Sequence, residues 1–243
     1  MPLRTLVDAL GSTIALRGPS LCAICRAWGE SRVCRDCFDR FAPAVTRCVR
    51  CALPVPAGVD VCGSCLAASP PFDAALAALD YRAPWDRLVA AFKFHGALDL
   101  GAVLADAIVG AERRRGAARP SLVVPVPLAP GRARERGYNQ AWELARRVAR
   151  RLDLPADAGL VLRLRETAHQ LALAPGERAA NVRNAFALEP RRRGELRGRT
   201  VAVVDDVMTT GSTAAEIAAV LHQAGAVRVE LWVLARTPRP ADL

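Results

Sequence analysis

Short apolar runs alternate with longer amphipathic stretches over most of this chain. The apolar runs are rich in branched side chains and suit strands that are buried on both faces. We expect such strands at 73–81, 122–126, 201–204 and 227–234. Apolar residues recur at helical spacing in four further stretches, 85–94, 98–115, 139–152 and 214–224. Because strands that alternate with helices form parallel sheets, the pattern predicts an α/β fold whose ligand crevice lies at the carboxyl ends of the strands.

The first 70 residues lack this alternation. A short amphipathic helix is indicated by apolar residues at helical spacing, namely Leu3, Leu6, Val7, Leu10 and Ile14. The Pro-stiffened stretch 68–72 is typical of a linker. We therefore expect a small N-terminal domain over residues 1–68, followed by a domain over residues 69–243 that is long enough to bury a sizeable core.

All eight cysteines lie before residue 66, in four Cys-x-x-Cys pairs: Cys22/Cys25, Cys34/Cys37, Cys48/Cys51 and Cys62/Cys65. A Cys-x-x-Cys turn directs two thiolates to one tetrahedral ion, so four pairs make two four-sulfur sites, for which Zn²⁺ is the best candidate. Such sites are structural, since cysteines fill every ligand position. Joining each pair to its neighbour in sequence closes loops of 8 and 10 residues at the least cost in entropy, and an interleaved pairing is the alternative.

Disulfides and an iron–sulfur cluster are the rival interpretations of the cysteines. Disulfides need an oxidising compartment, and two cysteines so close in sequence rarely form a structural bridge. Asp8 interrupts the apolar stretch before Cys22, and no clear cleavage site follows, which argues against a signal peptide. No apolar stretch reaches the length of a membrane span. We therefore expect a cytoplasmic protein whose small N-terminal domain is stabilised by two zinc ions.

The segment 201–213 joins an apolar strand, two acids and a hydroxyl-rich turn. Where the strand ends, the carboxylates of Asp205 and Asp206 can accept hydrogen bonds from vicinal ribose hydroxyls or coordinate an ion. The next residues offer hydroxyls and backbone N–H groups to a phosphate: Thr209, Thr210, Gly211, Ser212 and Thr213. The helix that follows adds the positive end of its dipole. If Ser212 or Thr213 merely capped that helix, the paired acids would be unexplained.

At these residues the chain resembles the type I phosphoribosyltransferases, whose fingerprint is an apolar strand, two acids and, a few residues later, Thr-Gly-Ser/Thr. The resemblance implies phosphoribosyl pyrophosphate (PRPP) with Mg²⁺ as the ligand. It also implies that Asp205 and Asp206 contact the ribose hydroxyls at the catalytic centre, and that residues 209–213 hold the 5′-phosphate. The segment is not the Gly-x4-Gly-Lys-Ser/Thr loop of nucleotide hydrolases, so ATP hydrolysis is not supported.

A second polar turn follows the expected strand at 122–126. Arg132, Arg134 and Arg136 stand at alternate positions there, and guanidinium groups can neutralise a pyrophosphate. An ordinary solvated basic loop is the alternative. Lys93 is the only lysine among 34 basic residues, which makes it a candidate for presenting a compact charge to a phosphate. The alternative for Lys93 is a surface position at the end of a helix.

The order of the motifs narrows the resemblance to the ComF (GntX-like) family of competence-associated, phosphoribosyltransferase-like proteins. After the Cys-x-x-Cys pairs, the chain carries the family's motifs at Lys93-Phe94, 125–127, 136–140, Arg163 or Arg165 with Thr167 and Gln170, Arg178 with Asn181, and 205–211. The match covers nearly the whole chain and implies a double zinc ribbon before the phosphoribosyltransferase domain. It also implies a mobile hood around 163–181, in which Gln170 and Arg178 are further candidates for PRPP contacts. His169 lies there too, but without a supporting motif a solvated loop histidine is the simpler interpretation.

Charge changes this picture little. The formal net charge is +10, with 8 basic and 5 acidic residues in the first 70 positions and 26 basic and 19 acidic residues in the rest. Such a balance suits a phosphate-rich ligand or nucleic acid, but charge alone does not establish specific binding of nucleic acid. The arginine clusters at 146–151 and 191–193 are most simply solvated faces, unless single-stranded DNA binds there.

Two functions follow from the resemblance. In the first, the protein is a pentosyl-transferring glycosyltransferase: pyrophosphate leaves PRPP toward Arg132 and Arg136, and an unidentified nucleophile attacks the anomeric carbon. In the second, it is a cytoplasmic DNA-uptake factor that handles single-stranded DNA, with a competence helicase as a further partner, and uses the PRPP site for binding or regulation. Salt-dependent binding of single-stranded DNA would favour the second function.

Overall fold

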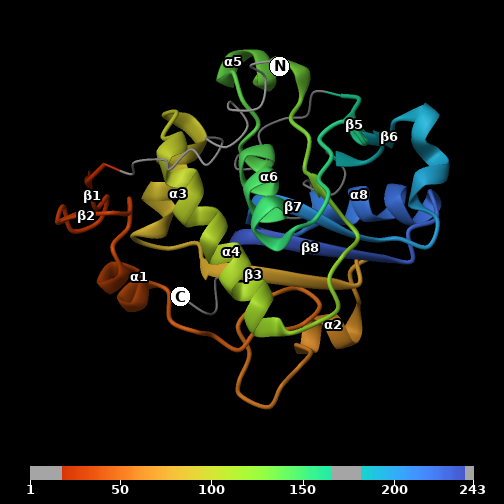
Figure 1. Ribbon diagram of the computed structural model, residues 1–243. Coiled ribbons are helices and arrows are strands. Elements are labelled where there is room, and N and C mark those ends of the chain that lie inside the picture. Colours follow the sequence, from red (N-terminus) through yellow and green to blue (C-terminus); the bar gives the residue numbers. More distant parts are fainter. Residues whose placement is uncertain (1–17, 166–181, 239–243) are drawn as a thin grey trace, which may run out of the picture.

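A four-stranded parallel sheet forms the centre of the computed structural model, which describes residues 18–165 and 182–238 (Figure 1). Its strands stand in the order β3 (Ala74–Asp80), β8 (Arg228–Arg236), β7 (Thr200–Met208) and β4 (Leu122–Pro125). Every neighbouring pair is parallel, so the carboxyl ends of the four strands meet at one edge. The four expected strands and the α/β class are confirmed.

Helices cover both faces of the sheet. One face carries α3 (Trp85–Phe94), α4 (Gly101–Arg115) and α6 (Gln140–Leu152), and the other carries α8 (Ser212–Gln223). All four helices are expected from the sequence, although the stretch 98–115 begins as the short 3-10 helix η1 (Leu98–Leu100). Over the part of the chain that the structure describes, no helix is long and apolar enough to cross a membrane.

Some short elements are not predicted by the apolar pattern. The helix α5 (Pro130–Arg136) lies where we expect a basic turn, and it buries no residue. The strands β5 (Val161–Arg163) and β6 (Phe186–Leu188) form a separate antiparallel pair, and the 3-10 helix η3 (Pro190–Leu196) follows them. A three-residue strand or a helix without an apolar face leaves no periodic signal in the sequence, which explains why these elements are missed.

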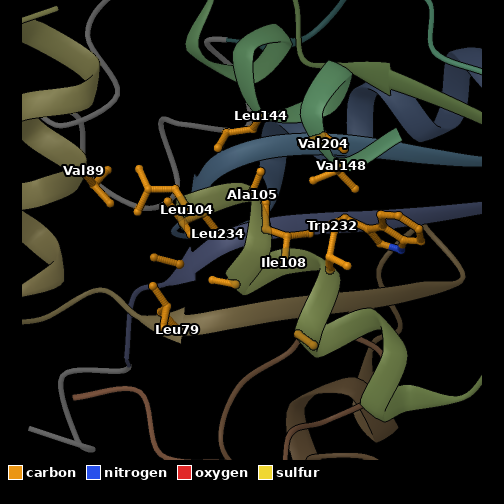
Figure 2. Packing of buried hydrophobic residues seen from close by; sticks show 14 of the residues in the cluster. Leu79, Val89, Leu104, Ala105, Ile108, Leu144, Val148, Val204, Trp232 and Leu234 are labelled. Atoms are coloured by element: carbon orange, nitrogen blue, oxygen red, sulfur yellow. The ribbon is translucent and has the colours of Figure 1, made fainter. Parts of the chain in front are cut away.

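The strands are buried on both faces, as their branched apolar runs predict. In β7, Val201 and Val203 belong to the core under α8, whereas Ala202 and Val204 belong to the core under α4 and α6. Figure 2 shows the side chains that meet in the second of these cores: Leu79, Val204, Trp232 and Leu234 from the sheet, Leu104, Ala105 and Ile108 from α4, and Leu144 and Val148 from α6.

The cysteine-bearing residues pack directly on this α/β unit (Figure 1). They form short elements: β1 (Ser20–Leu21), β2 (Trp28–Gly29), α1 (Arg35–Phe41) and α2 (Gly63–Ala67). The indole N–H of Trp85 donates to the carbonyl of Phe41 at 2.6 Å, and the guanidinium of Arg47 pairs with Asp80 at 2.8 Å. The amphipathic helix expected at residues 3–14 lies outside the described residues.

One buried carboxylate lies in the core under α4. Glu230 in β8 is 1% exposed and accepts hydrogen bonds from Arg115 at 2.6 Å, from Arg228 at 2.9 Å and from the indole of Trp232 at 3.0 Å. Burial alone would raise the pKa of Glu230, but the hydrogen bonds from Arg115 and Arg228 hold this pKa below its ordinary value. The carboxylate is therefore charged at neutral pH and anchors the end of α4 to the sheet.

We predict that Glu230→Gln lowers the free energy of unfolding by about 3 kcal/mol, because it leaves the partly buried Arg115 guanidinium without its counter-charge. Urea unfolding of the metal-replete protein at neutral pH measures this difference. The control is Glu195→Gln, which removes one of the two acidic partners of Arg192, in a surface pair with an N–O distance of 2.6 Å. That change should cost less than about 1 kcal/mol. Equal losses in the two variants would contradict the role given to Glu230.

Candidate functional site

The two adjacent acids lie near the carboxyl end of β7. Asp206 is 2% exposed, whereas Asp205 is half-buried and accepts a hydrogen bond from the backbone N–H of Asp206 at 2.9 Å. Lys93, near the end of α3, places its ammonium 3.0 Å from both carboxylate oxygens of Asp206. The only lysine of the chain is therefore the counter-ion of the acidic pair and not a surface residue.

Burial and charge perturb all three of these groups. Burial and the neighbouring charge of Asp206 raise the pKa of Asp205 to about 7. Burial alone would lower the pKa of the Lys93 ammonium, but the charges of Asp206 and Asp205 hold this pKa above its ordinary value. Asp205 thus changes its protonation close to neutral pH, while Lys93 stays charged.

The hydroxyl-rich turn, residues 209–213, connects β7 to α8. Gly211 is the residue before α8 and has a φ of 83°, a left-handed conformation that other residues adopt only with strain. The hydroxyls of Thr210 and Ser212 lie 2.8 Å apart. A small cavity of about 30 Å³ is lined by this turn and by Asp205. Hydroxyls, backbone N–H groups and the start of a 12-residue helix suit an anion at this position.

A second cavity, of about 140 Å³, adjoins the acids and is strongly basic. It is lined by Asp205 and Asp206, by Thr213 of the turn, and by four cationic side chains, Lys93, Arg132, Arg136 and Arg163. Asp205 and Thr213 line both cavities, so the hydroxyl-rich turn and the basic cavity are parts of one pocket. The structure therefore brings together the acids, the turn and the arginines that we identify in the sequence.

Only two of the three alternating arginines line this pocket. Because α5 is a helix and not a turn, Arg132 and Arg136 lie one helical turn apart on the same side, whereas Arg134 lies on another side and is exposed. The stretch that we expect as a basic turn is therefore a helix, and the two arginines that line the pocket are the two that we expect beside the pyrophosphate. The geometry of the helix places Arg132 and Arg136, but not Arg134, at the pocket.

The motif at 136–140 holds the elements around the pocket in place. The hydroxyl of Tyr138 donates to the carbonyl of Phe92 at 2.5 Å, which positions the end of α3 that carries Lys93. Asn139 caps α6 through the N–H of Ala141 at 2.9 Å and donates to the carbonyl of Val126 at 3.0 Å. Gln140 accepts from Arg136 at 2.5 Å. Tyr138 and Asn139 hold neighbouring elements in place, and Gln140 also lines the pocket. The sequence gives no sign of these partners.

Arg163 and Phe94 are among the residues lining the pocket that the sequence analysis does not name as ligand contacts. Arg163 at the end of β5 lines it and lies 5.4 Å over the ring of Phe186. Phe94 also lines it, is 52% exposed, and has the guanidinium of Arg136 5.0 Å from its ring centre. Both belong to motifs that we quote only as family features. The other candidates, Gln170 and Arg178, and His169, lie outside the described residues.

The remaining arginine clusters form ion pairs within the protein. On α6, Arg146 and Arg147 both pair with Glu143, and Arg151 pairs with Asp106. On η3, Arg192 pairs with Asp157 and Glu195. The pairs balance the charge of both clusters, but the side chains of Arg147 and Arg151 are only 15% and 19% exposed, so the cluster on α6 is not a fully solvated face.

The eight cysteines gather into two groups of four. One group contains Cys22, Cys25, Cys34 and Cys37, and the other contains Cys48, Cys51, Cys62 and Cys65. In each group the four sulfur atoms lie within 4.8 Å of one another, so each could hold one metal ion. The pairs are joined to their nearest neighbours in sequence, which is the pairing with the shortest loops.

The sulfur geometry fits a tetrahedral ion and not a disulfide. The Sγ atoms of Cys25 and Cys34 are 3.7 Å apart, and those of Cys51 and Cys62 are 3.6 Å apart. Sulfurs bound to one zinc ion stand about 3.8 Å apart, whereas a disulfide bond measures about 2.05 Å. The backbone N–H of Cys34 donates to the Sγ of Cys22 at 3.4 Å, and such donors stabilise metal-bound thiolates.

Comparisons with known proteins agree with this geometry. The model of the phosphoribosyl transferase domain family matches residues 139–242. DNA utilization protein YhgH of Escherichia coli (strain K12) is 36% identical over 226 residues, which cover 90% of this chain and 98% of that protein. Competence protein F of Haemophilus influenzae is 37% identical over 179 residues, which cover 72% of this chain and 78% of that protein.

Among solved structures, the glutamine phosphoribosylpyrophosphate amidotransferase from B. subtilis, complexed with ADP and GMP, is similar with a TM-score of 0.40 and 19% identity. The similar region covers 60% of this chain and 30% of that chain. The identity and coverage of the two named relatives, together with the domain match and the two four-cysteine groups, lead to one conclusion. This chain belongs to the ComF family and carries its phosphoribosyltransferase-type domain behind two four-cysteine groups.

Proposed function

We propose that this protein binds PRPP with Mg²⁺ in the pocket at the carboxyl end of β7. The observation that carries the proposal is the meeting of three kinds of group in one pocket: two acids, a hydroxyl-rich turn at a helix start, and several cations. Each kind matches one part of the ligand, namely the ribose, the 5′-phosphate and the pyrophosphate. A simple surface crevice would not need all three.

Each residue then has a role in the proposal. Asp205 and Asp206 accept hydrogen bonds from the ribose hydroxyls, and residues 209–213 bind the 5′-phosphate through hydroxyl and N–H groups. Arg132, Arg136 and Lys93 neutralise the pyrophosphate. Gln170 and Arg178 complete the proposed set, and Arg163 joins it as a lining residue.

The acids also suit Mg²⁺, because carboxylates are the oxygen ligands that this ion prefers and it usually binds through one or two of them together with substrate phosphates. When bound, Mg²⁺ would neutralise charge on the pyrophosphate. If an acceptor is present, the buried carboxylates can stabilise positive charge that develops on the ribose as pyrophosphate leaves, which is electrostatic catalysis of pentosyl transfer. With no acceptor, the same site serves to sense PRPP.

We also propose that each four-cysteine group binds one structural Zn²⁺, in a module over residues 1–68 that precedes the phosphoribosyltransferase domain of residues 69–243. The support is the tetrahedral spacing of the sulfurs and the small number of apolar residues in this module that could form a core of their own.

Handling of single-stranded DNA in the cytoplasm is a second candidate function. It is supported by the names of the relatives, one a DNA utilization protein and the other a competence protein. It is also supported by Phe94, an exposed aromatic ring beside Arg136 at the pocket, because aromatic rings next to cations stack with nucleobases. In this case PRPP would regulate the protein and would not be consumed.

We expect calorimetric titration to show binding of PRPP with Mg²⁺ to the zinc-replete protein. Asp205→Asn/Asp206→Asn should weaken this binding by more than about 100-fold, since it removes two charged acceptors. Asp106→Asn/Asp153→Asn, which changes two exposed acids, is the matched control and should bind like the natural chain. Normal affinity in the first variant would refute the proposed site.

The same samples separate the two functions. Release of pyrophosphate that depends on an added purine or pyrimidine base would establish an enzyme. Binding of a single-stranded oligonucleotide that weakens steeply with salt, without release of pyrophosphate, would favour DNA handling.

Affinity for PRPP with Mg²⁺ should fall as the pH decreases through about 7. Asp205 must be deprotonated to accept from both ribose hydroxyls, and its pKa in the ligand-free protein is about 7, so each pH unit below this value should cost up to about tenfold. The phosphates of PRPP also titrate in this range. Titrations of Asp205→Asn measure their contribution, and an unchanged pH dependence in that variant would contradict the role of Asp205.

Metal analysis of the purified protein should give two equivalents of zinc, one for each four-cysteine group. Cys25→Ser should lower the content toward one equivalent, and Cys25→Ser/Cys51→Ser should remove most of both. Visible absorbance from iron and acid-labile sulfide would instead identify an iron–sulfur cluster.

A further inference from the structure

Arg236 is a buried arginine at the last position of β8, with 6% exposure. Its Nε donates to the carbonyl of Cys51 at 3.0 Å. Its Nη1 donates to the carbonyls of Met208 at 3.0 Å, Thr209 at 2.6 Å and Thr237 at 2.8 Å. One guanidinium thus connects three segments that lie far apart in the sequence.

Two of these segments are functional in the proposal above. Cys51 belongs to the second four-cysteine group, and Thr209 is the first residue of the hydroxyl-rich turn. Hydrogen bonds from a charged donor are about twice as strong as neutral ones, and burial strengthens them further. Because the carbonyls of Met208 and Thr209 are fixed, the peptide planes that follow them are fixed as well. The N–H groups of the turn then keep their direction toward a phosphate.

Few close contacts other than those of Arg236 hold the turn where it faces the second four-cysteine group. A cavity of about 700 Å³ is lined by residues of both the second four-cysteine group and the turn, among them Cys51, Cys65, Thr210 and Ser212. Gly211 approaches Phe72 at the cavity wall, where an added Cβ would lie 3.5 Å from the ring. With so much open space, the turn is not held by close packing alone.

The first four-cysteine group is attached elsewhere. Arg32 donates to the carbonyl of Leu21, next to Cys22, at 2.7 Å and pairs with Asp99 before α4 at 2.7 Å. Cys22 and Cys37 lie in the core with Leu104 of α4. The two groups therefore provide an internal comparison, because each has an arginine that anchors the backbone at or beside one of its cysteines, but only Arg236 also bonds the turn.

We propose that Arg236 is a positioning residue that couples the second four-cysteine group to the hydroxyl-rich turn. Metal bound in that group and PRPP bound at the turn then strengthen each other's binding. A bound metal fixes the backbone at Cys51, whose carbonyl orients the guanidinium, and the guanidinium orients the turn. Coupling of this kind is reciprocal: bound PRPP must raise the affinity for the metal by the same factor by which the bound metal raises the affinity for PRPP. The proposal rests on PRPP binding, as proposed above.

The experiment compares Arg236→Met with Arg32→Met, two arginines of which only the first bonds the turn. Zinc release to a coloured chelator is followed with and without PRPP and Mg²⁺, and PRPP affinity is measured by calorimetry. In the natural chain, PRPP should lower the equilibrium transfer of one of the two zinc equivalents to the chelator by about tenfold, a typical coupling. In Cys25→Ser, which keeps the second group intact, this protection should persist.

Arg236→Met should retain both zinc equivalents, bind PRPP about tenfold more weakly and lose the protection of zinc by PRPP. Arg32→Met should keep normal PRPP affinity and the protection. If both variants weaken PRPP binding equally, the effect is general loss of stability and the inference is wrong. It is also wrong if PRPP still protects zinc in Arg236→Met.

Hydrogen exchange tests the positioning role of Arg236 independently of PRPP binding. Backbone amides at 208–213 should exchange at least about tenfold faster in Arg236→Met than in the natural chain, with zinc bound and without PRPP. If the natural chain binds no PRPP but this acceleration is seen, the proposed function fails while the positioning role stands. Equal exchange in the two proteins would overturn the positioning role.

Discussion

The pocket depends on the ion pair between Lys93 and Asp206. A carboxylate that is almost fully buried is costly unless it is paired, and here its partner comes from a residue 113 positions away in the sequence. The ammonium reaches Asp206 only if the end of α3 is held in place, and the bond from Tyr138 to the carbonyl of Phe92 holds it there. The motif at 136–140 thus positions Lys93, and Lys93 in turn stabilises the two adjacent acids of the motif at 205–211.

The same constraint explains why the acids differ. Asp206 is paired with the Lys93 ammonium, whereas burial and the neighbouring charge of Asp206 move the pKa of Asp205 toward neutrality. A ligand that brings hydroxyl donors or a divalent cation would restore the charge of Asp205. Ligand binding therefore stabilises the acidic pair, and in the ligand-free protein Lys93 stabilises it instead.

Much of the fold can be predicted from the sequence, because the strands and the long helices carry continuous periodic signals. The four-cysteine groups are also predictable in part, since loop length favours the pairing that the structure shows, although the sequence leaves an interleaved pairing open. Contacts across the chain are not. The helix α5 that puts Arg132 and Arg136 on one side is not predicted because it has no apolar face, and the roles of Asn139 and Arg236 depend on carbonyl groups that no side-chain pattern reveals. The acids and the turn are visible in the sequence because they are contiguous, whereas their supports are distant.

The net charge of +10 is also a weak guide to function, because it does not show which charges are paired in the folded protein. Arginines on α6 and η3 are matched by acids on the same or neighbouring elements, so their charge is balanced locally. At the pocket, four cationic side chains surround only two acids, and one of those acids is already paired. A compact polyanion gains more from such a concave site than from a flat basic face, because the surrounding protein screens the charges less than water does. Phe94, which is exposed beside Arg136 at this pocket, is a residue through which a single strand of DNA could use the same field. Both candidate functions therefore converge on the same few residues.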